Sequence, residues 1–335
     1  MGAGHKNSIV RILLLFAVCV LCICGCGSDG GNNETGAKNG ANSGKSVMAV
    51  VFPEYDWTAQ IIADVEGAPS LDLLIDSGVD IHSYQPSVED IVAISNCDMF
   101  IYVGGESEAW VEDVLKNTTN RNMVVVRLMD AVAGRLREEE VVEGMQAKEE
   151  EEDEEGPEYD EHIWLSLNNA KLCCEAITDA LCTIDSANGV RYRDNLSAYE
   201  KKLDELDGLY RETVNGSDKN TLLFGDRFPF RYLTEDYGLN YYAAFAGCSA
   251  ESNASFETIA FLADKADALK INTVLAIDGS DEKIARTVVN NSKSGDKKVA
   301  VLDSMQSVTN KDIEAGATYY GIMEKNLDVI REALK

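Results

Sequence analysis

The sequence predicts an α/β protein of two similar lobes with mainly parallel sheets, joined by one long α-helix. Short apolar runs alternate with stretches that carry apolar residues at helical spacing, a rhythm typical of parallel α/β units. This alternation occurs twice along the chain, and a long amphipathic stretch separates the two occurrences. The part with a core-forming pattern, residues 47–335, is also long enough for two domains of roughly 150 residues each.

The first 25 residues are predicted to be a secretory leader. Lys6 and Arg11 flank the start of an apolar run, and its uninterrupted part is shorter than the roughly 20 residues that cross a bilayer. The following Ile-Cys-Gly-Cys resembles a bacterial lipobox, in which a small residue precedes the cysteine that receives lipid. Cys26 is therefore the predicted lipidation site, and it would anchor the protein to the outer face of the cell membrane. An ordinary leader with incidental cysteines is the alternative.

Composition and charge limit the kinds of partner that this chain can bind. Residues 26–46 are rich in Gly, Asn and Ser and lack large apolar side chains, so they are predicted to form a flexible tether. The formal net charge of −28 excludes binding to nucleic acid or anionic lipid by charge. Attraction of cations is compatible with this charge, although solubility explains it equally well.

The cysteines after the lipobox do not form a recognisable motif. Their number is odd and no CxxC pair occurs, which argues against a disulfide framework and a zinc-finger-like site. They are predicted to be small core residues: Cys97, Cys173, Cys174, Cys182 and Cys248.

The first predicted lobe covers residues 47–189. Its opening apolar run predicts a buried strand that stops in a loop at Pro53, and WTAQIIADVEG predicts a helix. Further strands are predicted in LDLLIDSG, MFIYVGG and NMVVVRLMDAV, with helices between them. Ser87, followed by acidic residues, marks one helix start. The segment 138–161 interrupts this rhythm, because it is acidic and has no core periodicity, and it is predicted to be a mobile loop.

Residues 190–215 form the predicted linking helix. Its apolar positions recur at spacings of three and four: Leu196, Tyr199, Leu203, Leu206 and Tyr210. The second predicted lobe, residues 216–335, again alternates strands and helices. Gly238 is predicted to end the helix in PFRYLTEDY, and one long helix is predicted over TNKDIEAGATYYGIMEKNLDVIREALK.

Two histidines are the candidate functional residues, because they are the only ones outside the leader. His82 follows a predicted strand end and His162 precedes a predicted helix. These are the places where α/β folds position ligand groups. A single histidine at such a place is more often a surface or hydrogen-bonded residue, so position alone leaves both readings open.

The motifs around the two histidines resemble those of the metal-binding lipoproteins that serve ABC importers of zinc and manganese. GVDIHSYQPS matches the family pattern Gly-x-(Asp/Glu)-x-His-x-(Tyr/Phe)-x-Pro-(Ser/Thr), which carries the first metal histidine, here His82. DEHIWLS matches (Asp/Glu)-x-His-(Val/Ile)-Trp-Leu-(Asp/Ser), which carries the second, here His162. The resemblance covers nearly all of residues 47–335. It implies two lobes joined by a rigid helix, with one metal ion in the cleft between them.

The chain departs from the family at the third ligand. The family has His-Asp-Ala-(Phe/Tyr)-Gly-Tyr after a strand of the second lobe, where this chain has FGDRFPFRYL. Gly225 or Arg227 falls at the position of the histidine, and neither is a plausible ligand. We nominate Asp226, which lies between them; a role as a helix cap or an arginine partner is its alternative.

The fourth family ligand is an acid near the last strand, which indicates Asp303 in VAVLDSMQSVT. A helix cap is the alternative role of Asp303, and the zinc-type alignment would instead use Gln306, a poor ligand. Two imidazoles and two carboxylates suit zinc, manganese or iron(II). Zinc is favoured because it accepts imidazole–carboxylate tetrahedra, and because zinc-importing relatives carry a loop rich in His and acid just before the second metal histidine.

The resemblance implies a solute-binding protein, not an enzyme: a monomer that binds a divalent metal and presents it to an ABC permease, with release by small local rearrangements. The acidic run before His162 either concentrates cations beside the cleft or is a solvated spacer. A metal-dependent hydrolase is one alternative, although HExxH, GxSxG and P-loop motifs are absent. A metal-stabilised surface adhesin is another. The metal-binding hypothesis requires the two imidazole rings to lie within about 5 Å of each other.

Overall fold

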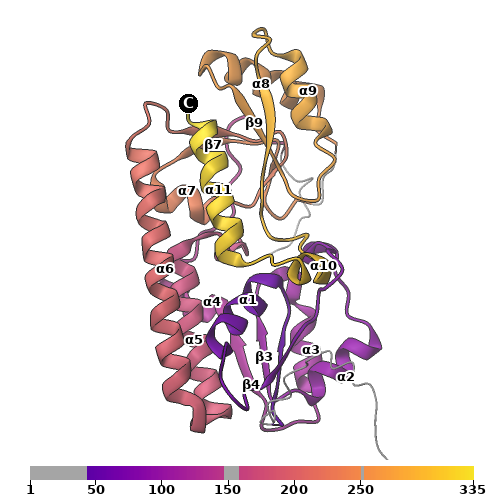
Figure 1. Cartoon of the computed structure of the whole chain (residues 1–335). Helices are drawn as coiled ribbons and strands as arrows, with labels where there is room; N and C mark the ends of the chain where they lie inside the picture. Colours follow the sequence, from indigo (N-terminus) through magenta and orange to yellow (C-terminus); the bar gives the residue numbers. More distant parts are fainter. Residues whose placement is uncertain (1–43, 147–157, 250–252) are drawn as a thin grey trace, which may run out of the picture. The chain divides into compact units, whose positions relative to one another are not determined.

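The computed structural model describes residues 44–146, 158–249 and 253–335 (Figure 1). These residues all belong to one unit of the chain, Gly40–Lys335. The predicted leader, Cys26 and residues 149–157 of the acidic run 149–161 lie outside the described residues. Among the helices of the described part, none combines the length and apolar character that a bilayer crossing requires.

The first lobe contains a parallel four-stranded sheet in the order β2-β1-β3-β4. Val47 of the central strand β1 lies opposite Leu71 on one side and Met99 on the other. The predicted parallel alternation is confirmed here. The strands are β1 (Ser46–Ala49), β2 (Ser70–Leu73), β3 (Met99–Tyr102) and β4 (Val124–Arg127). The helices are α1 (Phe52–Ile62), α2 (Val88–Asn96), α3 (Trp110–Lys116), α4 (Leu128–Ala131) and α5 (Leu167–Ile184).

The predicted loop at Pro53 is wrong, because helix α1 already begins at Phe52. Proline is tolerated in a first helical turn, where its missing N–H would have no intrahelical partner. The buried Glu54 carboxylate completes this helix start by accepting hydrogen bonds from the backbone N–H groups of Val50 (2.8 Å) and Val51 (3.1 Å). The strand predicted over residues 122–132 is also shorter than expected, since α4 follows β4 directly.

Helix α6 (Gly189–Asn215) agrees closely with the predicted linking helix. Its buried face contacts α1 and α5 of the first lobe and α7 and α11 of the second (Figure 1). The same apolar residues that predicted the helix, among them Tyr199, Leu203 and Tyr210, are buried in these contacts. One continuous helix therefore packs against both lobes.

The second lobe is built from parallel strand pairs: β5 with β7, β6 with β8, and β9 with β10. A parallel bridge between Phe224 and Leu275 connects the first of these pairs to the last. Its strands are β5 (Thr221–Leu223), β6 (Arg227–Phe228), β7 (Asn240–Tyr242), β8 (Phe245–Ala246), β9 (Thr273–Ile277) and β10 (Lys298–Leu302). Its helices are α7 (Arg231–Tyr237), α8 (Phe256–Ala268), α9 (Lys283–Asn291), α10 (Asn310–Glu314) and α11 (Tyr319–Ala333).

Two glycines end helices in this lobe. Gly238 follows α7 with a φ of 66°, as the sequence predicted. Gly316, with a φ of 95°, separates α10 from α11, so the single C-terminal helix predicted from the sequence is wrong. Left-handed backbone conformations of this kind are readily adopted only by glycine.

The two lobes share one hydrophobic core. Its buried residues come from both lobes and include Trp57, Phe100, Phe224, Phe230 and Tyr319. A second cluster lies between α8, α9 and their strands. Shared burial of this kind opposes free hinging, because opening the lobes would expose apolar surface to water.

Candidate metal centre

His82 is held in place by its neighbours on a short 3₁₀ turn, Ile81–Ser83. The Asp80 carboxylate accepts a hydrogen bond from the backbone N–H of His82 at 3.0 Å. On the ring, Nδ1 lies 2.6 Å from Ser107 Oγ. The turn follows Gly78, whose φ is 73° and where a Cβ would lie 2.8 Å from the Ser307 carbonyl oxygen. These contacts leave Nε2 as the ring nitrogen that faces His162.

His162 is fully buried and is oriented by Asp160. One carboxylate oxygen of Asp160 lies 2.8 Å from the backbone nitrogen of His162 and 3.0 Å from its Nδ1. Carboxylates that hold a histidine in this way fix the ring and raise its basicity as a metal ligand. Trp164 packs edge-on against the ring at a centroid distance of 5.2 Å. On another side, the backbone of Gly247 lies so close that a Cβ there would be 3.2 Å from His162 Cε1.

The two imidazoles meet although they are far apart in the sequence. Nε2 of His82 lies 3.2 Å from Nε2 of His162. Two nitrogens bound tetrahedrally to one zinc at 2.0–2.1 Å would lie about 3.3 Å apart. The distance condition derived from the sequence is therefore met, and both nitrogens can bond to one ion with little movement.

The thiol of a cysteine also lies close to the two imidazoles. The ligand atoms of His82, His162 and Cys248 all lie within 4.8 Å of one another. Cys248 follows strand β8, and its backbone N–H donates to Glu139 Oε1 at 2.7 Å. Sequence reasoning missed this residue by assigning it to the core, as it did for the four other cysteines after the lipobox. The available signals were the odd number of these cysteines and its place after a predicted strand.

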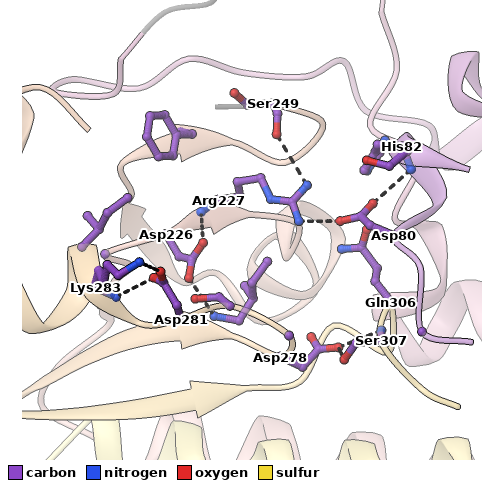
Figure 2. A pocket seen from close by; sticks show the side chains of 18 residues that line it. Asp80, His82, Asp226, Arg227, Ser249, Asp278, Asp281, Lys283, Gln306 and Ser307 are labelled. Atoms are coloured by element: carbon purple, nitrogen blue, oxygen red, sulfur yellow. Dashed lines mark hydrogen bonds and ion pairs between the residues drawn. The ribbon is translucent and has the colours of Figure 1, made fainter. Parts of the chain in front are cut away.

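Asp226 lies elsewhere in the cleft. It lines a cavity of about 380 Å³ together with His82, but it does not belong to the group of clustered ligand atoms (Figure 2). Its carboxylate accepts hydrogen bonds from the backbone N–H groups of Arg227 (2.9 Å) and Ile277 (3.3 Å). The guanidinium of Arg227 pairs with Asp80 at 2.5 Å instead. The ligand role of Asp226 stays a prediction.

Asp303 does not belong to the group of clustered ligand atoms either. It follows β10, accepts a hydrogen bond from the N–H of Met305 at 2.8 Å, and is not among the residues that line the cavity. Burial and the nearby Asp278 raise the pKa of Asp303 to about 6. Asp278 itself lines the cavity and accepts hydrogen bonds from Ser304 and Ser307. The ligand role of Asp303 also stays a prediction.

Several acidic side chains surround the two histidines. Glu161 Oε2 lies 3.8 Å from His82 Nδ1. Burial by itself would lower the pKa of His162, but Asp160, Glu161 and Asp80 outweigh this effect and raise it above its ordinary value. Negative charge that stabilises a protonated imidazole stabilises a bound cation in the same way, so protons and metal compete for this site.

The segment before the acidic run is attached to the second lobe. Gln146 donates its backbone N–H to the carbonyl of Ala244 at 3.0 Å, and Glu143 pairs with Lys265 at 2.9 Å. At the base of the segment, an antiparallel bridge joins Glu138 to Tyr159. The described ends of the predicted loop are thus attached to the rest of the protein near the site, whereas residues 149–157 of the acidic run lie outside the described residues.

A second group of carboxyls is buried next to Ser107. Glu108 and Glu54 are 2% and 1% exposed. Burial is the largest effect and raises the pKa of Glu108 to about 8, with a further contribution from Glu161. Burial and the proximity of Glu108 raise the pKa of Glu54 well above its ordinary value. Glu108 is therefore predominantly neutral in the folded protein near neutral pH.

We expect the variant Glu108→Gln to become more stable relative to the wild type as the pH rises. The unfolded chain releases the Glu108 proton above about pH 4.5, while the folded chain holds it up to about 8. The stabilising contribution of the neutral group is therefore complete below the lower value and is lost as the pH approaches the higher one. Glutamine stays neutral throughout, so the difference in unfolding free energy should shift by at least about 1.4 kcal/mol, the equivalent of one pKa unit.

Urea unfolding of the metal-free protein at about pH 5 and about pH 8 measures this shift. Glu112→Gln, an exposed position in the first turn of the following helix α3, is the control and should show no such change. Equal pH dependence of Glu108→Gln and the wild type would contradict the prediction.

Comparison with known proteins places this arrangement in a family. The fold and the paired imidazoles define a metal-binding protein of two α/β lobes. Residues 47–333 match the ZnuA family, described as the periplasmic component A of the zinc-uptake complex, and the chain belongs to this family.

Individual relatives agree with this assignment. The chain is 28% identical over 304 residues to the zinc-binding protein AdcA of Streptococcus pyogenes, covering 89% of this chain and 58% of AdcA. It is 27% identical over 325 residues to the high-affinity zinc uptake system protein ZnuA of Bacillus subtilis, covering 96% and 97% of the two chains. The chain thus spans less than two thirds of the AdcA relative but nearly the whole of the Bacillus one.

Solved structures share the fold. The Zn(II)-bound ZnuA-like domain of Streptococcus pneumoniae AdcA has a TM-score of 0.67 at 26% identity, covering 87% of this chain and 99% of that one. The metal-dependent lipoprotein YcdH of Bacillus subtilis has a TM-score of 0.69 at 27% identity, with the same coverage. The predicted fold class, two α/β lobes with parallel sheets, is confirmed.

Proposed function

We propose that this protein captures a divalent transition-metal ion outside the cytoplasm and delivers it to an ABC importer. Zinc is the favoured ion, with manganese or iron(II) as the alternatives. The observation that carries the proposal is the 3.2 Å separation of the two Nε2 atoms, each on a ring positioned through its Nδ1 by a side-chain partner. Paired, preoriented imidazoles at this distance suit one ion.

The relatives support zinc as the cargo. The family is described as part of a zinc-uptake complex, and the S. pneumoniae domain carries Zn(II). In this proposal, Cys26 anchors the protein to the membrane, and the residues between Cys26 and strand β1, which begins at Ser46, act as the tether. The acidic run before His162 raises the local concentration of cations by its field, an effect that salt would screen. The chain acts as a monomer, and its binding partner is the membrane permease.

Hydrolysis has little support. A catalytic zinc needs an open coordination position and a nearby general base. Outside the leader, the chain has no histidine besides the pair that faces the proposed ion. The family is a transport component, which also favours binding over catalysis.

Deletion of the gene tests delivery in the organism that encodes this chain. Growth in metal-depleted medium should be impaired, and zinc added in excess should restore it, whereas reintroduction of a His162→Ala form should not. Equal growth of the deletion strain and the parent under depletion would contradict a role in uptake. Hydrolytic activity of the zinc-loaded protein, lost in the same variant, would instead support the hydrolase alternative.

A further inference from the structure

We propose that the sulfur of Cys248 is a third ligand of the same ion, so that the site contains a thiolate as well as two imidazoles. This inference rests on the proposed function and specifies its donor set. Cys248 would be the third metal ligand, in place of Asp226, which we had nominated from the sequence.

The geometry supports a shared ion. The Cys248 sulfur lies within 4.8 Å of a ligand nitrogen on both His82 and His162. In a tetrahedral site with zinc–nitrogen bonds of about 2.0 Å and zinc–sulfur bonds of about 2.3 Å, neighbouring ligand atoms lie about 3.3–3.6 Å apart. A contraction of roughly 1 Å, within the reach of a side-chain adjustment, is enough to bring all three atoms to bonding distance.

The backbone around Cys248 is held against the site from two sides. Gly247, directly before it, packs so closely on the His162 ring that a Cβ would lie 3.2 Å from Cε1 and 2.9 Å from the Phe228 carbonyl oxygen. The N–H of Cys248 donates to Glu139, which lies on the segment that leads to the acidic run. These two contacts, of Gly247 with the His162 ring and of the Cys248 N–H with Glu139, hold the backbone of Cys248 beside the imidazole rings.

The other candidate donors are engaged elsewhere. The carboxylate of Asp226 accepts two backbone N–H groups, and Asp303 does not line the cavity. The remaining cysteines of the described residues are not in the ligand group. Cys182, which is also partly exposed, lies 3.7 Å from the carbonyl oxygen of Gly189 instead.

A thiolate ligand changes which metals the site prefers. Sulfur is a soft donor that favours zinc, cadmium and copper(I), whereas manganese prefers oxygen. Binding also displaces the thiol proton, because only the thiolate coordinates metal. The site is therefore expected to discriminate more strongly against manganese than one built from imidazoles and carboxylates.

Cobalt(II) substitution tests the assignment directly. The full-length protein loaded with cobalt should show a thiolate-to-cobalt charge-transfer band in the near ultraviolet. This band should persist in Cys182→Ala, the matched control, and disappear in Cys248→Ala. Zinc competition should show a loss of affinity in Cys248→Ala of at least about 10-fold, the lower end of what even an outer-shell partner contributes. Asp226→Asn should retain more affinity for zinc than Cys248→Ala does, because the proposal gives the ligand position of Asp226 to the cysteine.

The outcomes separate this inference from the function on which it rests. If the wild type binds zinc through its histidines but shows no charge-transfer band, and Cys248→Ala binds normally, the cysteine assignment is overturned and the capture function stands. If zinc binding is lost in Asp226→Asn or Asp303→Asn instead, the carboxylate assignment replaces it. If the wild type binds neither metal, the proposed function itself fails. Because the band is read in the wild type, a folding defect in the variant does not obscure the result.

Discussion

Replacement of His162 by alanine is expected to weaken zinc binding by more than about 100-fold. Loss of an outer-shell partner of a metal-bound histidine typically costs 10- to 100-fold in affinity, and removal of the ligand itself should cost more. His162 contributes one of two nitrogens that lie 3.2 Å apart, and its carboxylate partner Asp160 would be left buried without the imidazole. Competition against a chromophoric zinc chelator measures the change.

Two further variants make this prediction specific. Asp160→Asn keeps the ring but removes the charged acceptor of Nδ1, so it should fall between the wild type and His162→Ala, with a loss of roughly 10- to 100-fold. Asp207→Asn weakens a half-buried ion pair with Arg211 on α6, outside the group of clustered ligand atoms, and should leave affinity unchanged. Wild-type affinity in His162→Ala would exclude this residue as a ligand.

Replacement of Trp164 by alanine is expected to lower the free energy of unfolding by about 3–5 kcal/mol, the usual cost of removing a large aromatic side chain from a core. Trp164 is 2% exposed, and its indole Nε1 donates to the carbonyl of Ser304 in the second lobe at 2.9 Å. Its own carbonyl accepts a hydrogen bond from the Tyr319 hydroxyl at 2.6 Å. The side chain therefore connects the lobes beside the His162 ring.

Urea unfolding of the metal-free protein measures this loss. The matched variant Trp164→Phe keeps most of the apolar contacts and removes only the indole donor, which leaves the Ser304 carbonyl without that partner. It should lose about 1–3 kcal/mol, less than the alanine variant. A Trp164→Ala protein as stable as the wild type would show that the lobes do not depend on this contact.

The sequence predicted those parts of the fold that depend on local pattern. Apolar periodicity predicted the start of the long helix to within one residue. The prediction was accurate because the helix has buried apolar residues along its whole length, from Gly189 to Asn215. Gly238 ended its helix as expected. The prediction at Pro53 was wrong because proline is compatible with a helix start as well as with a loop. Here the side chain of Glu54 accepts a hydrogen bond from the backbone N–H of Val50 and stabilises the helix start.

The site was only partly accessible from the sequence. His82 and His162 stood out through their motifs and through the scarcity of histidine. The odd number of cysteines and the place of Cys248 after a predicted strand did not identify it as a ligand, because its position depends on the tertiary packing of Gly247 against the His162 ring. Asp226 was nominated by its place in the family motif. The motif does not reveal that backbone N–H groups donate hydrogen bonds to this carboxylate.

The crystal structure of the zinc-loaded protein, with anomalous data at the zinc edge, tests the central claim most directly. The account predicts one zinc peak between the two lobes, bonded to Nε2 of His82 and Nε2 of His162 at about 2.0–2.1 Å each. A zinc peak bonded to neither ring, or to only one of them, would contradict it.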